Sequence, residues 1–389
     1  MKYNNFKEHR LSLLGFGTMR LPLTPDGSID RDVTFQMVDY AIEHGINYFD
    51  TAYPYHGGLS EVVAGDALRR HPRESWYIAN KYPGHQIASE YNPEEIFEDQ
   101  LRKCGVEWFD FYLMHNIHET CIDIYLDPKW GILEYFIKQK EIGRIRHLGF
   151  SAHAELETLK HFLDSPYGEH MEFCQIQLNF LDWSLQRARE KVELLNSRNI
   201  PIWVMEPLRG GKLLSIATPE EAFRWVAGIP GVTMILSGMS NEEQMVENIE
   251  LFNHINPLSQ EECDRLYALA EQMKGSVPCT ACNYCTPACP IGLDIPTLIQ
   301  ARNDFAIETS FTPIMRIESL PKEGHPSNCI GCGACSQMCP QGIDIPEVIS
   351  ELNSHLAKAP LWSEICRQRE IAARKMREAK QKETLQYIN

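Results

Sequence analysis

The sequence predicts an α/β fold in which a (β/α)8 TIM barrel is followed by a smaller, mainly α-helical domain. Between residues 11 and 255, eight short apolar or β-branched segments alternate with longer helical patterns, which is typical of a parallel sheet. Eight such units in about 250 residues favour a closed barrel, and no Gly-x-Gly-x-x-Gly follows the first strand. Because 389 residues exceed one typical core, we expect two domains, 1–257 and 258–389.

The barrel elements follow one another along the chain. The predicted strands cover residues 12–17, 47–50, 76–81, 109–115, 145–151, 173–178, 201–205 and 233–237. The predicted helices cover residues 31–44, 59–70, 93–104, 129–140, 154–163, 185–198, 219–227 and 241–253. Start signals include Pro93 at a first helical position and a capping box that begins at Ser240. Beyond the barrel we expect helices at 259–274, 295–305 and 362–385.

Composition argues against two classes of partner. The chain has 37 Lys and Arg against 53 Asp and Glu, and a surface this acidic repels phosphate backbones and anionic lipid head groups. No apolar run approaches the roughly 18 residues of a membrane span. The opening MKYNNFKEHR lacks the apolar segment of an export signal. We expect a cytoplasmic enzyme that binds neither nucleic acid nor membrane.

Cysteine is unevenly distributed, and eight of the 13 cysteines fall into two identical runs. The runs are Cys279-x2-Cys282-x2-Cys285-x3-Cys289-Pro290 and Cys329-x2-Cys332-x2-Cys335-x3-Cys339-Pro340. This is the spacing of bacterial ferredoxins that carry two [4Fe–4S] clusters. Zinc is the alternative, but two C-x2-C pairs would satisfy it and would leave the third spacing and the proline unexplained. The sequence therefore predicts a ferredoxin-like iron–sulfur domain.

In such a run the fourth cysteine ligates the other cluster. The expected ligands of cluster 1 are Cys279, Cys282, Cys285 and Cys339, and those of cluster 2 are Cys329, Cys332, Cys335 and Cys289. The remaining five cysteines are expected to be small buried apolar residues.

Four polar residues fall at or just after successive strand ends, where barrel enzymes gather their chemistry. Asp50 ends the second predicted strand, Tyr55 follows five residues later, and Lys81 and His115 end the next two strands. Each alone could be structural, for instance an ion pair or a core histidine. Together they suit carbonyl reduction, because hydride addition builds negative charge on an oxygen that then needs a proton donor.

The sequence resembles the aldo-keto reductases from Ser12 to about His254, and its C-terminal third resembles a dicluster ferredoxin domain. The Asp-x4-Tyr spacing, G-F-G-T-M-R at the first strand and the later G-F-S, Q-I-Q and E-N-I segments match. The resemblance implies a tetrad of Asp50, Tyr55, Lys81 and His115 acting with NADP or NAD on a small carbonyl substrate. We expect Tyr55 to be the general acid with its pKa lowered by Lys81, which Asp50 holds, while His115 orients the carbonyl oxygen.

The resemblance also implies which residues contact the nicotinamide nucleotide. Ser151 and Gln175 would bind the carboxamide, but the asparagine usual after this serine is missing, which leaves His153 as the candidate. Met205 stands in place of an aromatic that stacks on the nicotinamide. The remaining expected contacts are Gly17, Thr18 and Met19 after strand one, Pro207, Leu208, Gly210, Gly211 and Lys212 after strand seven, and Gly238, Ser240, Gln244, Glu247 and Asn248 after strand eight. A 2′-phosphate would fall to Ser240, Arg209 or Lys212, and the choice between NADPH and NADH stays open.

Hydride carries two electrons, whereas each cluster exchanges one, so the two halves need a connection. We favour clusters that exchange electrons with an external carrier such as a ferredoxin. One alternative is a reductase driven by the clusters or by FMN, without nicotinamide. Another is a non-enzymatic redox sensor that binds nicotinamide. Substrate and oligomeric state stay open.

Overall fold

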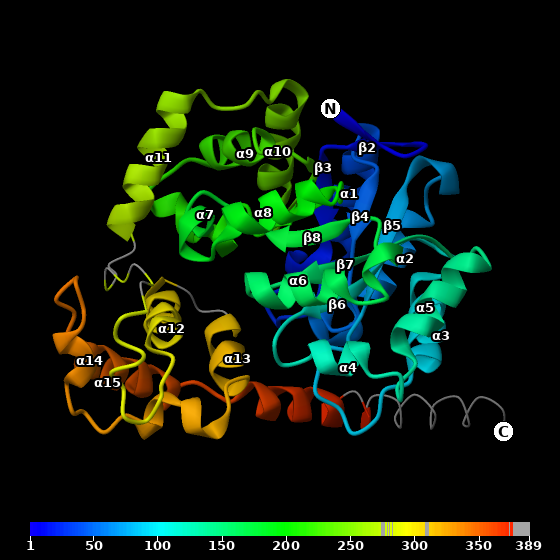
Figure 1. Ribbon diagram of the computed structural model, residues 1–389. Coiled ribbons are helices and arrows are strands. Elements are labelled where there is room, and N and C mark those ends of the chain that lie inside the picture. Colours follow the sequence, from blue (N-terminus) through cyan, green and yellow to red (C-terminus); the bar gives the residue numbers. More distant parts are fainter. Residues whose placement is uncertain are drawn as a thin grey trace. The chain divides into compact units, whose positions relative to one another are not determined.

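The fold is taken from a computed structural model that describes residues 1–273, 277, 279, 281, 283–307, 311–372 and 374–375 (Figure 1). Its main strands are β3 (Leu14–Gly17), β4 (Tyr48–Asp50), β5 (Tyr77–Tyr82), β6 (Phe109–Ile117), β7 (Ile145–Ala152), β8 (Cys174–Gln177), β9 (Ile202–Met205) and β10 (Val232–Gly238). Each strand pairs in parallel with the next, and β10 pairs with β3 to close the barrel. The predicted barrel is confirmed, with strand ends within about two residues of those expected.

Helices follow the strands in the predicted alternation. They are α1 (Arg31–Glu43), α2 (Ser60–Leu68), α3 (Pro93–Cys104), α5 (Ile132–Glu141), α6 (Leu156–Asp164), α8 (Ala188–Ser197), α9 (Pro219–Ala227) and α10 (Glu242–His254), with short α4 (Ile122–Leu126) and α7 (Asp182–Leu185) between them. The start of α9 shows the sequence signals that begin such a helix. Thr218 and Glu221 form a reciprocal capping box, and Pro219 occupies the first turn.

The capping box predicted for the last barrel helix is not formed, and the N-cap lies one residue later than expected. Asn241, not Ser240, is the N-cap of α10, and its side chain accepts from the Gln244 N–H over 2.9 Å. The Ser240 N–H instead donates to the Gln244 side chain. Asn241 has the extended backbone that an N-cap needs, so its carbonyl oxygen is the one correctly placed.

An unpredicted hairpin, β1 (Tyr3–Phe6) and β2 (His9–Ser12), precedes the barrel. Its Phe6 and Leu11 join the buried cluster formed by barrel-strand side chains such as Phe111 and Trp203. The Phe6 and Trp203 rings meet edge to face, 5.0 Å between centroids. The hairpin therefore covers the end of the barrel at which the strands begin.

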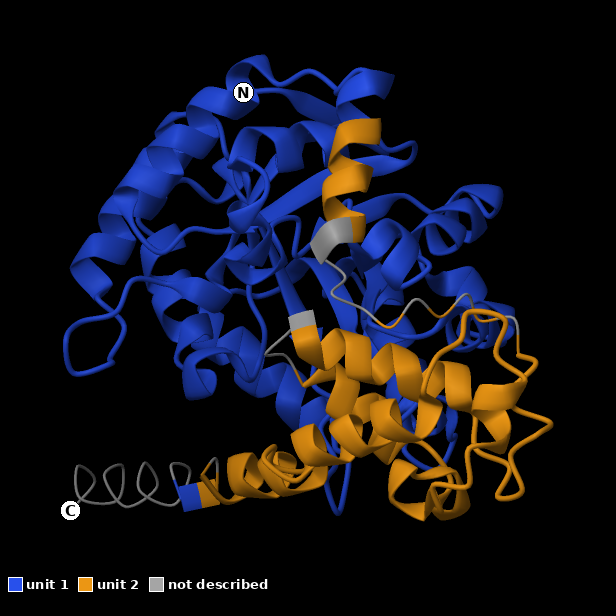
Figure 2. Ribbon diagram, turned by 90° about the vertical axis from the view of Figure 1, so that its left-hand side faces the viewer, with its two compact units in different colours: residues 1–263, 375–389 blue, residues 264–374 orange. Residues whose placement is uncertain are grey.

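The chain divides into two compact units, one of Met1–Cys263 with Lys375–Asn389 and one of Asp264–Arg374 (Figure 2). The division falls within α11 (Gln260–Met273), the helix expected at 259–274. The boundary at 257/258 stays a prediction. No helix among the described residues is long and apolar enough to cross a membrane.

The second unit is helical, as predicted. Its helices are α12 (Ile295–Ile307), α13 (Thr312–Glu318), α14 (Ala334–Gln337), α15 (Ile345–Leu356) and a segment at 362–372, while the part of the expected tail helix after residue 375 lies outside the described residues. α12 and α15 begin alike, because each starts at the isoleucine of an Asp-Ile-Pro in which Asp294 or Asp344 accepts from a first-turn N–H. Their apolar side chains share one buried cluster. The duplicated sequence thus forms a duplicated structure.

Candidate active site and cluster sites

The four predicted tetrad residues come together at the end of the barrel where the strands finish. Asp50 is the last residue of β4, Lys81 lies in β5 and His115 in β6. Tyr55 begins the short 3-10 turn Tyr55–Gly58. Its ring meets that of His115 edge to face, 5.9 Å between centroids.

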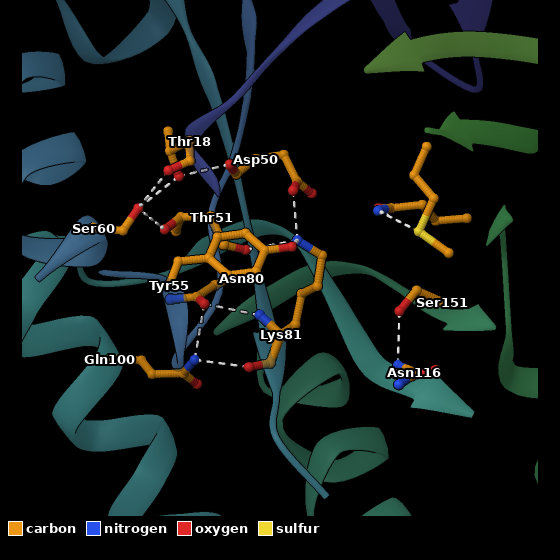
Figure 3. A network of polar contacts seen from close by, with 12 residues as sticks. Thr18, Asp50, Thr51, Tyr55, Ser60, Asn80, Lys81, Gln100, Asn116 and Ser151 are labelled. Carbon is orange, nitrogen blue, oxygen red and sulfur yellow. Dashed lines mark hydrogen bonds and ion pairs between the residues drawn. The ribbon is translucent and has the colours of Figure 1, made fainter. Parts of the chain in front are cut away.

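Lys81 is the centre of this group. Its side chain is fully buried, and its ammonium donates to the Asp50 carboxylate, to the Thr51 carbonyl oxygen over 2.8 Å and to the Tyr55 hydroxyl oxygen over 3.5 Å (Figure 3). A buried ammonium is stable only with such partners. Lys81 is therefore fixed with its charge toward the phenol.

The expected direction of the Tyr55 pKa is wrong. Burial raises the pKa of Tyr55 well above its ordinary value, and the carboxylates of Asp50 and Glu206 raise it further. Burial also lowers the pKa of Lys81 and raises that of Asp50. Burial is the largest cause for Tyr55, so the nearby ammonium does not bring the pKa of the phenol below its ordinary value. In this structure Tyr55 is a protonated donor at neutral pH.

Hydrogen bonds from neighbouring side chains fix the backbone of Lys81. The Asn80 side chain accepts from the Lys81 N–H over 2.8 Å and from Gln100, which also donates to the Lys81 carbonyl oxygen (Figure 3). Asn80 in turn donates to the buried Glu61, which Lys103 neutralises over 3.0 Å. Every member has a partner, so the network holds Lys81 rigidly.

Thr18, expected at the nucleotide, supports Asp50. It is buried, and its hydroxyl donates to the Asp50 carbonyl oxygen over 2.9 Å while accepting from Ser60 (Figure 3). Its neighbour Met19 is more than half exposed. These contacts make Thr18 a positioning residue for Asp50.

A β-bulge shapes the strand that carries His115. The register between β6 and β7 shifts between Met114 and Ile117, and Asn116 has a left-handed backbone with φ of 56°. The Asn116 N–H donates to the Ser151 hydroxyl oxygen over 2.8 Å (Figure 3). The bulge thus directs His115 and Asn116 differently from a regular strand.

The residues present fit a nicotinamide carboxamide. The Asn116 Oδ1 and Gln175 Oε1 atoms are buried and have no hydrogen-bond partner among the described residues. They offer two acceptors for an amide group, and the Ser151 hydroxyl, which already accepts, retains its hydrogen to donate. Met205 contacts the Gln175 amide through sulfur at 3.6 Å. Asn116 was missed because its closeness to Ser151 arises only in the folded barrel.

Arg20 closely approaches the glycines in the loops after β9 and β10. Gly210 and Gly211 have φ of 64° and 90°, and a Cβ on Gly210 would lie 3.1 Å from the Arg20 guanidinium. A Cβ on Gly238 would lie 3.3 Å from the Arg20 side chain. Arg20 therefore stands between the two loops, half exposed, with Glu206 at 3.9 Å. Sequence reasoning missed Arg20, although the basic residue at the end of G-F-G-T-M-R could have indicated it.

Arg209 cannot serve as the expected holder of a 2′-phosphate. Its side chain is buried, and its Nε lies 3.2 Å from both carboxylate oxygens of Asp182. Asp182 also accepts from Gln177 and Asn179. This buried ion pair fixes the loop below the glycines, so its charge is not free for a ligand.

Among the other residues expected to contact the nucleotide, some are exposed and some are buried. Pro207 is buried, Leu208 and Lys212 are partly buried, and Gly17 lies where β3 pairs with Gly238. Ser240, Gln244 and Glu247 are exposed in and before the first turns of α10, whereas Asn248 is buried and donates to Ser237 over 3.2 Å. The exposed residues therefore lie near the start of one helix, whose first turn also carries Glu242 and Glu243.

The cluster cysteines line two cavities in the second unit. One is lined by Cys279, Cys285 and Cys339, and the other by Cys289, Cys329, Cys332 and Cys335. Cys282 lies outside the described residues. Each cavity brings together thiols from both runs, which suits the donor set of a [4Fe–4S] cluster.

A model of the aldo/keto reductase family matches residues 13–222. The chain belongs to this family. A model of a 4Fe-4S dicluster domain matches residues 278–343. The chain is therefore an oxidoreductase of the aldo/keto reductase family with a C-terminal iron–sulfur domain, as the sequence predicts.

Known proteins are similar to about two thirds of the chain. A protein named NADH-specific methylglyoxal reductase, from Escherichia coli, is 26% identical over 64% of this chain and 77% of its own. A solved aldo-keto reductase from Bacillus halodurans, in its holo form, is 24% identical over 69% of this chain and 96% of its own, with a TM-score of 0.57. One from Klebsiella pneumoniae, solved with NADP and acetate, is 22% identical over 68% and 93%, with a TM-score of 0.56. The structural likenesses show the fold.

Proposed function

We propose that this chain reduces a small carbonyl compound with hydride from NADH or NADPH, and that two [4Fe–4S] clusters exchange electrons with an external carrier such as a ferredoxin. The observation that carries the first part is the buried Lys81 ammonium, which contacts both the Asp50 carboxylate and the Tyr55 hydroxyl. Because NADH-specific methylglyoxal reductase is a relative, 2-oxoaldehydes with NADH are the first pair to assay.

In the proposed reaction, Tyr55 gives its phenolic proton to the carbonyl oxygen while the carbonyl carbon receives hydride, which yields the alcohol. The nicotinamide ring supplies that hydride when bound. Lys81 stabilises the phenolate that remains, Asp50 holds Lys81, and His115 orients the carbonyl oxygen. Water then returns the proton to Tyr55.

The proposed nucleotide contacts start with Ser151, Gln175 and Asn116 at the carboxamide, where the unpaired oxygens of Gln175 and Asn116 support the assignment. Arg20 is proposed for the pyrophosphate because its guanidinium lies beside Gly210 and the carbons of its side chain lie beside Gly238. Gly210, Gly211 and Gly238 would allow backbone N–H groups to approach the phosphates.

The cluster cysteines are proposed as ligands in the crossed arrangement, which the lining of the two cavities supports. Such clusters supply or accept one electron at a time. The cavities belong to the second unit, so removal of the clusters is expected to leave the tetrad in place.

The deciding experiment replaces Tyr55 with Phe in the full-length protein, purified without oxygen. Loss of a general acid is expected to lower kcat for methylglyoxal reduction about 10²- to 10⁴-fold, with iron and sulfide unchanged. Tyr53→Phe is the matched control, because this ring in the same loop lies against Lys103, 4.1 Å from its Nζ. Full activity of Tyr55→Phe, or flavin released by acid, would contradict the proposal.

A further inference from the structure

Two histidines and a glutamate converge at the end of the barrel opposite to the tetrad. His9 begins β2 of the hairpin, and His147 lies near the start of β7. Their imidazole Nε2 atoms lie 2.8 Å apart. The Glu8 carboxylate lies 3.3 Å from the His9 Nε2 and 3.8 Å from the His147 Nε2. Three ligating atoms thus fall within 4.8 Å of one another.

We propose that His9, His147 and Glu8 bind a zinc ion. Imidazole nitrogen and carboxylate oxygen are ligands that zinc prefers, and three protein ligands leave its fourth position to water. Two imidazoles on a tetrahedral zinc ion stand about 3.3 Å apart, so binding requires the rings to separate by about 0.5 Å. Glu8 is mostly exposed, which gives the ion an entry path.

Glu172 orients His147 for this role. One oxygen of its carboxylate lies 3.4 Å from the His147 Nδ1, and the other accepts from the Leu148 N–H over 3.0 Å. Since a carboxylate accepts only, the hydrogen of the neutral ring belongs on Nδ1, and the Nε2 lone pair then faces His9. Lys7 and Lys140 both pair with the Glu172 carboxylate. Its negative charge partly cancels the positive charge that these two lysines would place near the ion.

Aromatic rings hold the two imidazoles. Phe6 packs edge to face on His147 at 5.1 Å between centroids, and Tyr77 packs likewise on His9 at 5.0 Å. Both histidines are at least nine-tenths buried. An ion here would join the hairpin to β7. It would stabilise the folded barrel, because only the folded chain assembles the site.

The test uses the full-length protein with its clusters in place, stripped of loose metal and titrated with zinc under nitrogen. We expect one zinc per chain, a rise in Tm, and an affinity lowered at least about tenfold by Glu8→Gln or by His147→Gln. His170→Gln is the matched control, because this partly exposed histidine lies beside Glu169 at 3.9 Å and is expected to change nothing. Anomalous diffraction at the zinc edge should place the ion between His9 and His147.

Glu8→Gln decides the question, because it removes an exposed ligand and leaves the buried rings in place. Equal zinc affinity of wild type and Glu8→Gln would overturn the proposal. So would no binding by wild type, or an anomalous peak at the cluster cysteines in place of one at the histidines. Iron is measured together with zinc in each sample, so that replacement of cluster iron by zinc would be recognised as a loss of iron.

Discussion

The Asn116 N–H donates to the Ser151 hydroxyl oxygen over 2.8 Å, across the bulge in β6. This bond joins the strand that carries His115 to the strand that carries a proposed nicotinamide contact. The Asn116 backbone is left-handed, a conformation that asparagine and glycine tolerate better than other residues.

Replacing Asn116 separates its backbone role from its side-chain role. Asn116→Gly keeps the left-handed backbone and removes Oδ1, so we expect nucleotide affinity about fivefold lower, one hydrogen bond's worth, with little change in Tm. Asn116→Ala should show the same loss and also a lower Tm, because alanine is strained there. Fluorescence titration and thermal unfolding measure the two effects. Unchanged affinity in Asn116→Gly would remove this residue from the proposed site.

Breaking the buried Lys81–Asp50 pair should reduce stability as well as activity. Lys81→Met leaves a buried carboxylate without its partner, which costs about 3–5 kcal/mol in the free energy of unfolding. The double variant with Asp50→Asn should recover most of that loss, because no uncompensated charge remains, yet should stay inactive. Urea unfolding followed by tryptophan fluorescence compares the three proteins. Equal stability of the single and double variants would show that the carboxylate left by Lys81→Met carries no cost.

The raised pKa of Tyr55 has a consequence for pH dependence. Since burial keeps the phenol protonated, the reduction rate should not fall through loss of this proton between neutral pH and about pH 10. Alcohol oxidation needs the phenolate, so its rate should increase with pH over the same interval. Profiles of kcat/KM in both directions measure this. A decline in reduction centred well below pH 10, absent in Tyr55→Phe, would mean that the bound state reverses the shift.

Arg20→Gln tests the cation between the glycine loops. Losing a charge-assisted contact should raise the KM for the nucleotide about tenfold and leave kcat nearly unchanged. The effect should shrink at high salt, because ions screen an exposed charge. Arg31→Gln serves as the control, since this exposed arginine pairs with Asp66 on helix surfaces. An equal KM for both variants would exclude Arg20 from the site.

The crossed cysteine arrangement predicts which variants resemble one another. Cys279→Ser and Cys339→Ser should lose the same cluster, although these cysteines lie in different runs, and Cys289→Ser should match Cys329→Ser. Each should lose about half of the iron. Electron paramagnetic resonance of the reduced proteins distinguishes the remaining cluster. If Cys339→Ser instead matches Cys329→Ser, each run holds its own cluster.

Much of the site could be predicted because a parallel barrel gathers the ends of its strands. Asp50 ends its strand as predicted, and Lys81 and His115 lie one and two residues before the ends of theirs. The cysteine spacing predicted the second domain. The hairpin escaped prediction because its turn, Lys7-Glu8, lacks the Asn-Gly or Asp-Gly that marks a tight turn. Arg20 and Asn116 escaped because only folding brings them beside other loops. The Tyr55 pKa depends on burial, which spacing does not reveal.

Each cysteine cavity draws its walls from both copies of the duplicated segment. A chain that stopped before Cys329 would lose three of the four proposed ligands of one cluster and one proposed ligand of the other. A single copy alone would need a second molecule to supply the fourth cysteine of a cluster. Duplication therefore places within one polypeptide a complete set of cluster ligands that would otherwise have to come from two molecules.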